Sequence, residues 1–88
     1  MMYRIAEGVH ARRVHDEVII FDERAKDYLG LKASGAVIWF ILADGGSDAD
    51  AVAELMTRFE VDLETAASDV AAFITDLLRR EIVAATAR

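Results

Sequence analysis

The sequence predicts an α+β domain in which a three-stranded antiparallel sheet precedes three helices, with a winged helix-turn-helix-like outline. A β-branched run at residues 18–21 and an alternating segment at residues 26–31 lie in the first third of the chain. From residue 47 onwards the apolar residues recur three and four positions apart, which is the spacing of a helix face. The polar links are short, with neither a linker nor an internal repeat. We therefore expect one domain covering residues 1–88.

Three strands are expected, at residues 9–14, 18–21 and 26–31, after a lead-in of residues 1–7 without a clear period. His15-Asp16 and the segment 22–25 have the length and polarity of hairpin links. In the third strand, side-chain alternation places Leu29 and Leu31 on one face. Tyr28 and Gly30 then occupy the other face, and the short links imply an antiparallel meander.

Three helices follow, at about residues 33–43, 47–59 and 63–80. By periodicity alone the first could also be a buried strand, because eight successive residues are apolar. Ser34 as the expected N-cap and Gly45 as the expected C-terminal stop favour a helix that is apolar nearly all round. Ser47 or Asp48 caps the second helix and Asp62 the third. The predicted buried stripes are Val52, Leu55, Met56 and Phe59 in the second helix and Ala66, Val70, Phe73, Ile74, Leu77 and Leu78 in the third.

Composition narrows the functional class. The chain is 55% hydrophobic and lacks proline and cysteine, which excludes a disordered chain, disulfides and thiolate chemistry. Its longest apolar run, residues 36–43, is far shorter than the ~20 residues of a membrane span. No secretion signal is recognisable. We expect a soluble cytoplasmic domain.

Charge argues against nucleic acid as a partner. The net charge is −6 and basic and acidic residues balance in residues 1–32, so the acidic excess lies in the helical part. Nucleic-acid binding needs a basic face. A DNA-binding reading of the helix pair makes the last helix the recognition helix, yet its outward positions include no basic residue; they are Glu64, Thr65, Ser68, Asp69, Thr75 and Asp76.

The sequence contains no recognisable catalytic constellation. His10 and His15 are five positions apart, and this odd spacing places them on opposite faces of a strand. No carboxylate cluster accompanies them. Ser34, Ser47 and Ser68 have no base nearby in the sequence and suit caps or exposed helix positions. We expect no catalytic residue, no metal and no other cofactor, and hence a protein that is not an enzyme.

The order of motifs resembles the PqqD-like family of peptide-recognition domains. The resemblance rests on "DYLGLKASGAVIWFILADGGSDADAVAEL" followed by "FEVDLETAASDVAAFITDLLRREIV" and covers about residues 8–85. The matching positions, in order, are Tyr28, Leu31, Ile38, Trp39, Leu42, Gly45, Leu55, Asp69, Val70, Phe73, Ile74 and Leu77. Lys32 departs from the pattern, because relatives often have an asparagine there that caps the helix.

The resemblance implies a RiPP recognition element, a peptide chaperone that binds the leader of a ribosomally made precursor and presents it to a maturation enzyme. The recognition subunit of split lasso-peptide leader peptidases is the most similar type, and the pyrroloquinoline-quinone type serving a radical enzyme is the alternative. An unrelated adaptor or dimerisation domain is a further alternative. The leader is expected to add as a strand to strand three, beside the last helix.

Physical reasoning supports that location, because a meander leaves its last strand with a free edge that can template another strand. The expected peptide-binding residues are Lys26, Asp27, Tyr28, Leu29, Gly30, Leu31, Asp69, Val70, Phe73, Ile74 and Leu77. Each apolar helix position among them also suits plain core packing. Trp39 and Phe40 point roughly 100° apart, so both cannot face the same core. The other aromatic residue is then either available to a partner enzyme or buried under the first strand.

Overall fold

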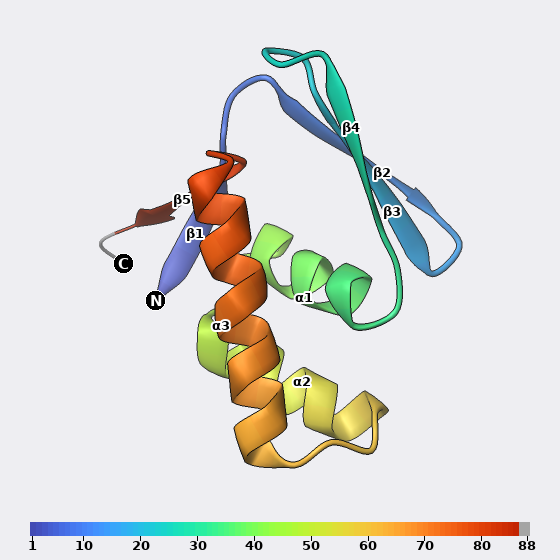
Figure 1. Ribbon diagram of the computed structural model, residues 1–88, viewed down its shortest axis with the longest axis vertical. Helices are drawn as coiled ribbons and strands as arrows, with labels where there is room; N and C mark the ends of the chain where they lie inside the picture. The colour runs from blue at the N-terminus through green and yellow to red at the C-terminus, as the bar shows by residue number, and fades with distance from the viewer. Residues whose placement is uncertain (87–88) are drawn as a thin grey trace.

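The computed structural model describes residues 1–86 and confirms the α+β prediction (Figure 1). A three-stranded sheet lies beside a bundle of three helices, and a separate pair of short strands joins the two ends of the chain. In chain order the elements are β1 (Met2–Ile5), β2 (Val9–Val14), β3 (Glu17–Asp22), β4 (Asp27–Leu31), α1 (Ser34–Ala43), α2 (Asp48–Arg58), α3 (Leu63–Arg79) and β5 (Val83–Thr86).

The main sheet is the expected meander, with strand order β2-β3-β4 and both pairings antiparallel. Val18 and Ile20 of β3 face the helices and are each 1% exposed, so they anchor the sheet to the core. The last strand begins one residue later than expected. Lys26 has a φ of 55°, in the left-handed region, and therefore belongs to the turn before β4.

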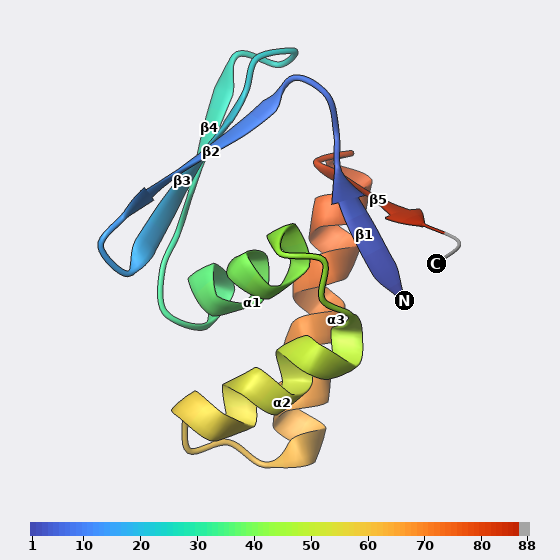
Figure 2. The same cartoon turned by 180° about the vertical axis from the view of Figure 1, so that it is seen from behind.

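The β1–β5 pair was not predicted as a sheet. Met2 pairs with Thr86 and Ile5 with Val83, so residues expected to form an unstructured lead-in bond to the segment after α3 (Figure 2). Tyr3 turns inward and donates a hydrogen bond to Asp48 Oδ2 at 3.1 Å. Burial, followed by this hydrogen bond and the Asp48 charge, raises the pKa of Tyr3 to about 12.

The helix ends follow ordinary capping chemistry with one exception. Ser47 and Asp50 form a reciprocal capping box at the start of α2, and Asp62 accepts the Thr65 N–H at 2.8 Å at the start of α3. The predicted Ser34 cap is wrong. Ala33 is the N-cap of α1 and provides no side-chain bond, and Ser34 is already helical.

One continuous core joins the sheet to the helices. Trp39 is 1% exposed and belongs to this core, whereas Phe40 is only half-buried and lies under the Arg13 guanidinium, 4.7 Å from its ring centroid. Two predicted stripe residues, Met56 and Leu78, are instead exposed, because each lies at the edge of its helix face. Within residues 1–86 the longest apolar helix is too short to cross a bilayer.

Candidate functional site

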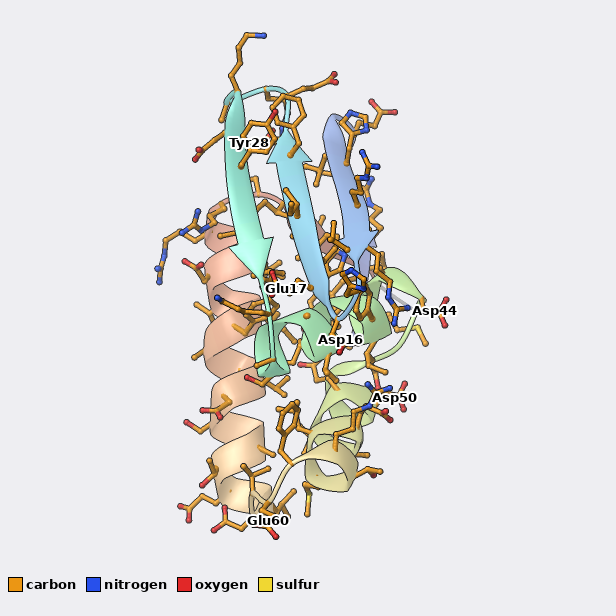
Figure 3. The ribbon with its side chains drawn as sticks, turned by 90° about the vertical axis from the view of Figure 1, so that its right-hand side faces the viewer. Asp16, Glu17, Tyr28, Asp44, Asp50 and Glu60 are labelled. Atoms are coloured by element: carbon orange, nitrogen blue, oxygen red, sulfur yellow. The ribbon has the colours of Figure 1, made fainter. Side chains whose placement is uncertain are left out.

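The free edge of β4 is the structural feature around which the candidate site is built. β4 is the last strand of the sheet and lies on the same side as α3 (Figure 3). The Tyr28 N–H donates to the Asp27 carboxylate at 2.9 Å and so points away from β3. The pairing of β2 with β3 agrees with this orientation, because the Glu23 N–H donates to Gly8 O at 2.9 Å. Hydrogen-bonded and non-hydrogen-bonded pairs alternate in an antiparallel sheet, and counting from this bond makes Phe21–Tyr28 and Ile19–Gly30 non-hydrogen-bonded pairs. Tyr28 and Gly30 therefore present their backbone groups at the edge.

A hollow opens between the start of β4 and the end of α3. We call it the Ile82 hollow; its volume is about 220 Å³ and it is lined by Ile20, Asp22, Ala25, Asp27, Tyr28, Leu29, Arg80 and Ile82. Its floor is apolar, because Ile20 and Ile82 are both buried in the core. Its rim is charged. An extended chain along β4 would pass directly over it.

Arg24 links the turn before β4 to the residues that follow α3. Its guanidinium binds Asp22 through two hydrogen bonds, at 2.8 and 3.0 Å, and also donates to Glu81 O at 3.0 Å. The turn before β4 is thereby tied to the end of α3. The Arg24 side chain also lowers the pKa of Asp22, because its hydrogen bond favours the charged carboxylate.

Phe73 brings α3 to the far end of β4. The Phe73 ring packs over Gly35, where an added Cβ would lie 3.4 Å from Phe73 Cε1 and 3.8 Å from Leu31 Cδ2. Leu29, Leu31 and Phe73 are all half-buried, so each retains some accessible apolar surface on the side facing the helices.

A second hollow of about 220 Å³ lies where α1 begins and α2 ends. This Asp69 hollow is lined by Ala33, Ser34, Leu55, Phe59, Val61 and Asp69. It is mainly apolar, and Asp69 supplies its only carboxylate. Since Arg80 lines the first hollow and Asp69 the second, the two hollows lie towards opposite ends of α3.

The structure brings most of the predicted binding residues to this region but gives them different roles. Lys26 lies in the turn, Asp27, Gly30 and Tyr28 are exposed on β4, and Leu29, Leu31 and Phe73 are half-buried. Val70, Ile74 and Leu77 are 1%, 4% and 1% exposed. These three residues pack in the core beneath the surface between β4 and α3. Core packing is the alternative role that the sequence already allows for each of them.

Sequence reasoning missed Arg24, Arg80 and Ile82 as parts of the site. Ile82 and Val83 are adjacent β-branched residues, which is a weak strand signal, although nothing local indicates that they lie beside β4.

The histidines and carboxylates do not assemble a second site. His10 bonds Glu23 Oε1 at 2.9 Å on the exposed sheet face, and His15 lies in the β2–β3 turn with a φ of 59°. In the part of the chain that the structure describes, residues 1–86, no three potential metal-ligating side chains converge.

Comparison with known proteins points to one family. The family model described as Coenzyme PQQ synthesis protein D (PqqD) matches residues 17–83. One similar solved structure is TbiB1 in complex with the TbiA(beta) leader peptide; the TM-score is 0.87 at 27% identity, covering 97% of this chain and 99% of that one. Another is a lasso peptide synthetase B1 complexed with the leader peptide, with a TM-score of 0.86 at 26% identity, covering 97% and 100%. A search of curated sequences finds no significant match.

Proposed function

The chain belongs to the PqqD family, and from that premise we propose that it binds the leader segment of a ribosomally synthesised precursor peptide and delivers it to a leader peptidase in lasso-peptide biosynthesis. Two structural neighbours that match nearly the whole chain were solved with a leader peptide, and one of them is a lasso peptide synthetase B1. The fold supports the same conclusion independently, through the free edge of β4.

The observation that carries the proposal is the orientation of the β4 backbone. Tyr28 and Gly30 direct their N–H and C=O groups away from β3, towards the side on which α3 lies. An extended peptide can satisfy these groups as a fourth strand, which supplies affinity without reading sequence. A buried or paired edge could not accept it.

Side-chain recognition is proposed for the groove between β4 and α3. In an added strand, residues aligned with Leu29 and Leu31 point towards the helices, because paired residues share a face. The residue aligned with Leu29 then enters the Ile82 hollow, and the one aligned with Leu31 meets Phe73. Val70, Ile74 and Leu77 support this surface from below, and Asp69 is available to a basic or hydroxyl group of the leader.

The chain itself is proposed to carry no catalytic step. Its contribution is to hold the precursor so that cleavage by a bound enzyme becomes effectively intramolecular, which raises the local substrate concentration to the millimolar range for a short flexible connection. Removing this chain should then raise the KM of the peptidase for the full precursor far more than it lowers kcat.

A second candidate function is supported by the family model itself, which describes a protein of coenzyme PQQ synthesis. On that reading the same β4 edge presents a precursor to a radical enzyme. The two readings share the peptide site and differ in the partner enzyme. Co-purification with the peptidase or with the radical enzyme encoded near this gene separates them.

Calorimetric titration with the leader peptide of a precursor encoded near this gene tests the proposal. A saturable 1:1 isotherm is expected, with no heat from a scrambled leader of equal composition and none from duplex DNA. Absence of heat with every such leader, from a protein with a normal circular dichroism spectrum, would refute leader binding. A salt-dependent isotherm with the duplex would instead support a DNA-binding domain.

A further inference from the structure

The face of the sheet turned away from the helices contains a gap at Gly30. The strand register produces two adjacent rows on this face, His10–Phe21–Tyr28 and Arg12–Ile19–Gly30. The first row is filled by rings, with Phe21 and Tyr28 centroids 4.8 Å apart (Figure 3 shows Tyr28 leaning from β4 over the sheet). The second row ends in a glycine, and no heavy atom lies within 4 Å of the position a Cβ would take there.

Large apolar side chains border this gap. Ile19 is 43% exposed and Tyr28 is 68% exposed. With Phe21 and residues of β2 they line a hollow of about 360 Å³, predominantly apolar, formed by His10, Ala11, Arg12, Ile19, Phe21 and Tyr28. The gap opens onto the free edge of β4, where the peptide strand is proposed to lie. Because the gap is continuous with that edge, we expect a side chain of the leader peptide to cover it.

On the basis of the proposed function, we infer that the leader carries a large apolar or aromatic side chain at the position aligned with Gly30, and that this side chain crosses the glycine to pack on Ile19 and Tyr28. The aligned residue must point to this face, because paired residues share a face. Ile19 and Gly30 form a non-hydrogen-bonded pair, whose Cα atoms are about 4.5 Å apart, and Gly30 would form a hydrogen-bonded pair with the peptide, whose Cα atoms are about 5.5 Å apart. The Ile19 Cα therefore lies about 10 Å from the Cα of the aligned peptide residue.

An aromatic ring on the leader covers part of that distance and the Ile19 side chain covers the rest, so the two side chains contact each other over Gly30. Such a ring also shields the glycine backbone, which is how an aromatic partner compensates for a glycine at a sheet edge. The other outward position of β4 differs, because Tyr28 already fills its own row with a ring. Selectivity on this face is therefore assigned to the Gly30 position alone.

Two protein variants, each tested with two peptides, examine the inference. Ile19→Ala should weaken binding of the leader about two- to fivefold, the range of one cross-strand contact. It should leave unchanged the affinity of a leader in which the residue aligned with Gly30 is replaced by alanine. Val14→Ala is the matched control, since Val14 is 41% exposed on the same face but belongs to β2, at the opposite edge of the sheet from β4. Its affinity for both peptides should equal that of the wild type.

A direct observation accompanies the affinities. Intermolecular nuclear Overhauser effects are expected between the Ile19 methyl groups and the side chain aligned with Gly30. If the leader binds along β4 but this residue is small or polar, or its replacement and Ile19→Ala have additive effects, the inference is refuted while leader binding stands. If Ile19→Ala slows cleavage of the precursor without changing leader affinity, this face contacts the enzyme and the inference is also refuted. No binding by any leader would overturn the proposed function itself.

Discussion

Asp27 controls the availability of the β4 edge, and replacing it should tighten leader binding. In the free protein its carboxylate accepts the Tyr28 N–H at 2.9 Å, and an added strand needs that same N–H. A hydrogen bond of this kind contributes about 0.5–1.5 kcal/mol net. Asp27→Ala removes the competing acceptor, so the dissociation constant should fall about two- to tenfold. Calorimetry at about 0.15 M salt, where exposed charges are screened beyond ~8 Å, measures the change.

Asp27→Asn is the matched control, because asparagine removes the charge and keeps an oxygen that can accept the Tyr28 N–H. Its affinity should remain close to that of the wild type. Equal tightening by both variants would assign the effect to charge. An unchanged or weaker affinity for Asp27→Ala would refute the competition. The protein must remain monomeric by sedimentation, because a charge lost from a free edge favours self-pairing of strands.

Three further predictions concern the groove and the helix caps. Phe73→Asp should abolish measurable leader binding, because it places a charge where the ring lies over Gly35. The result counts if the circular dichroism spectrum of the variant is normal. Undiminished affinity would exclude Phe73 from the site. Ser47→Ala should lower the free energy of unfolding by about 1 kcal/mol in urea titrations, since it removes a cap that accepts the Asp50 N–H, and no change would mean the cap contributes nothing. The Thr65 backbone N–H is the main cause that lowers the pKa of Asp62. The contribution of Asp62 to the stability of the folded protein is therefore complete above about pH 4 and is lost as the pH falls through the lowered pKa of the folded state. Asp62→Asn should reduce the slope of the free energy of unfolding against pH on the acid side. An identical slope in the variant would contradict this role of Asp62.

The sequence was sufficient to predict the main sheet and the helices because their signals are local. A β-branched run defined β3, a mixed pattern before the His15-Asp16 link indicated β2, and the Asp62 cap and apolar stripe defined α3 within a residue of its observed end. The β1–β5 pair was missed because each strand has four residues and its partner lies at the other end of the chain. Pairing at that separation depends on how the helices place the ends, and no local pattern encodes it.

The candidate site was predicted at the level of the strand and not at the level of individual contacts. The meander implied that the third strand has a free edge, and the structure has it in β4. Periodicity could not distinguish Phe73, which retains accessible surface, from Val70 and Ile74, which are buried on the same stripe. The Arg24 bridge to Glu81 O joins residues 57 positions apart, and it depends on the tertiary fold.

Amide hydrogen exchange at the two sheet edges tests strand addition most directly. Tyr28 and Gly30 direct their amides outward from β4, and Ala11 does so from the opposite edge, β2. Saturating leader peptide should slow exchange at Tyr28 and Gly30 and leave Ala11 unchanged. Slower exchange at Ala11 with Tyr28 and Gly30 unaffected would place the peptide on β2 and contradict the account.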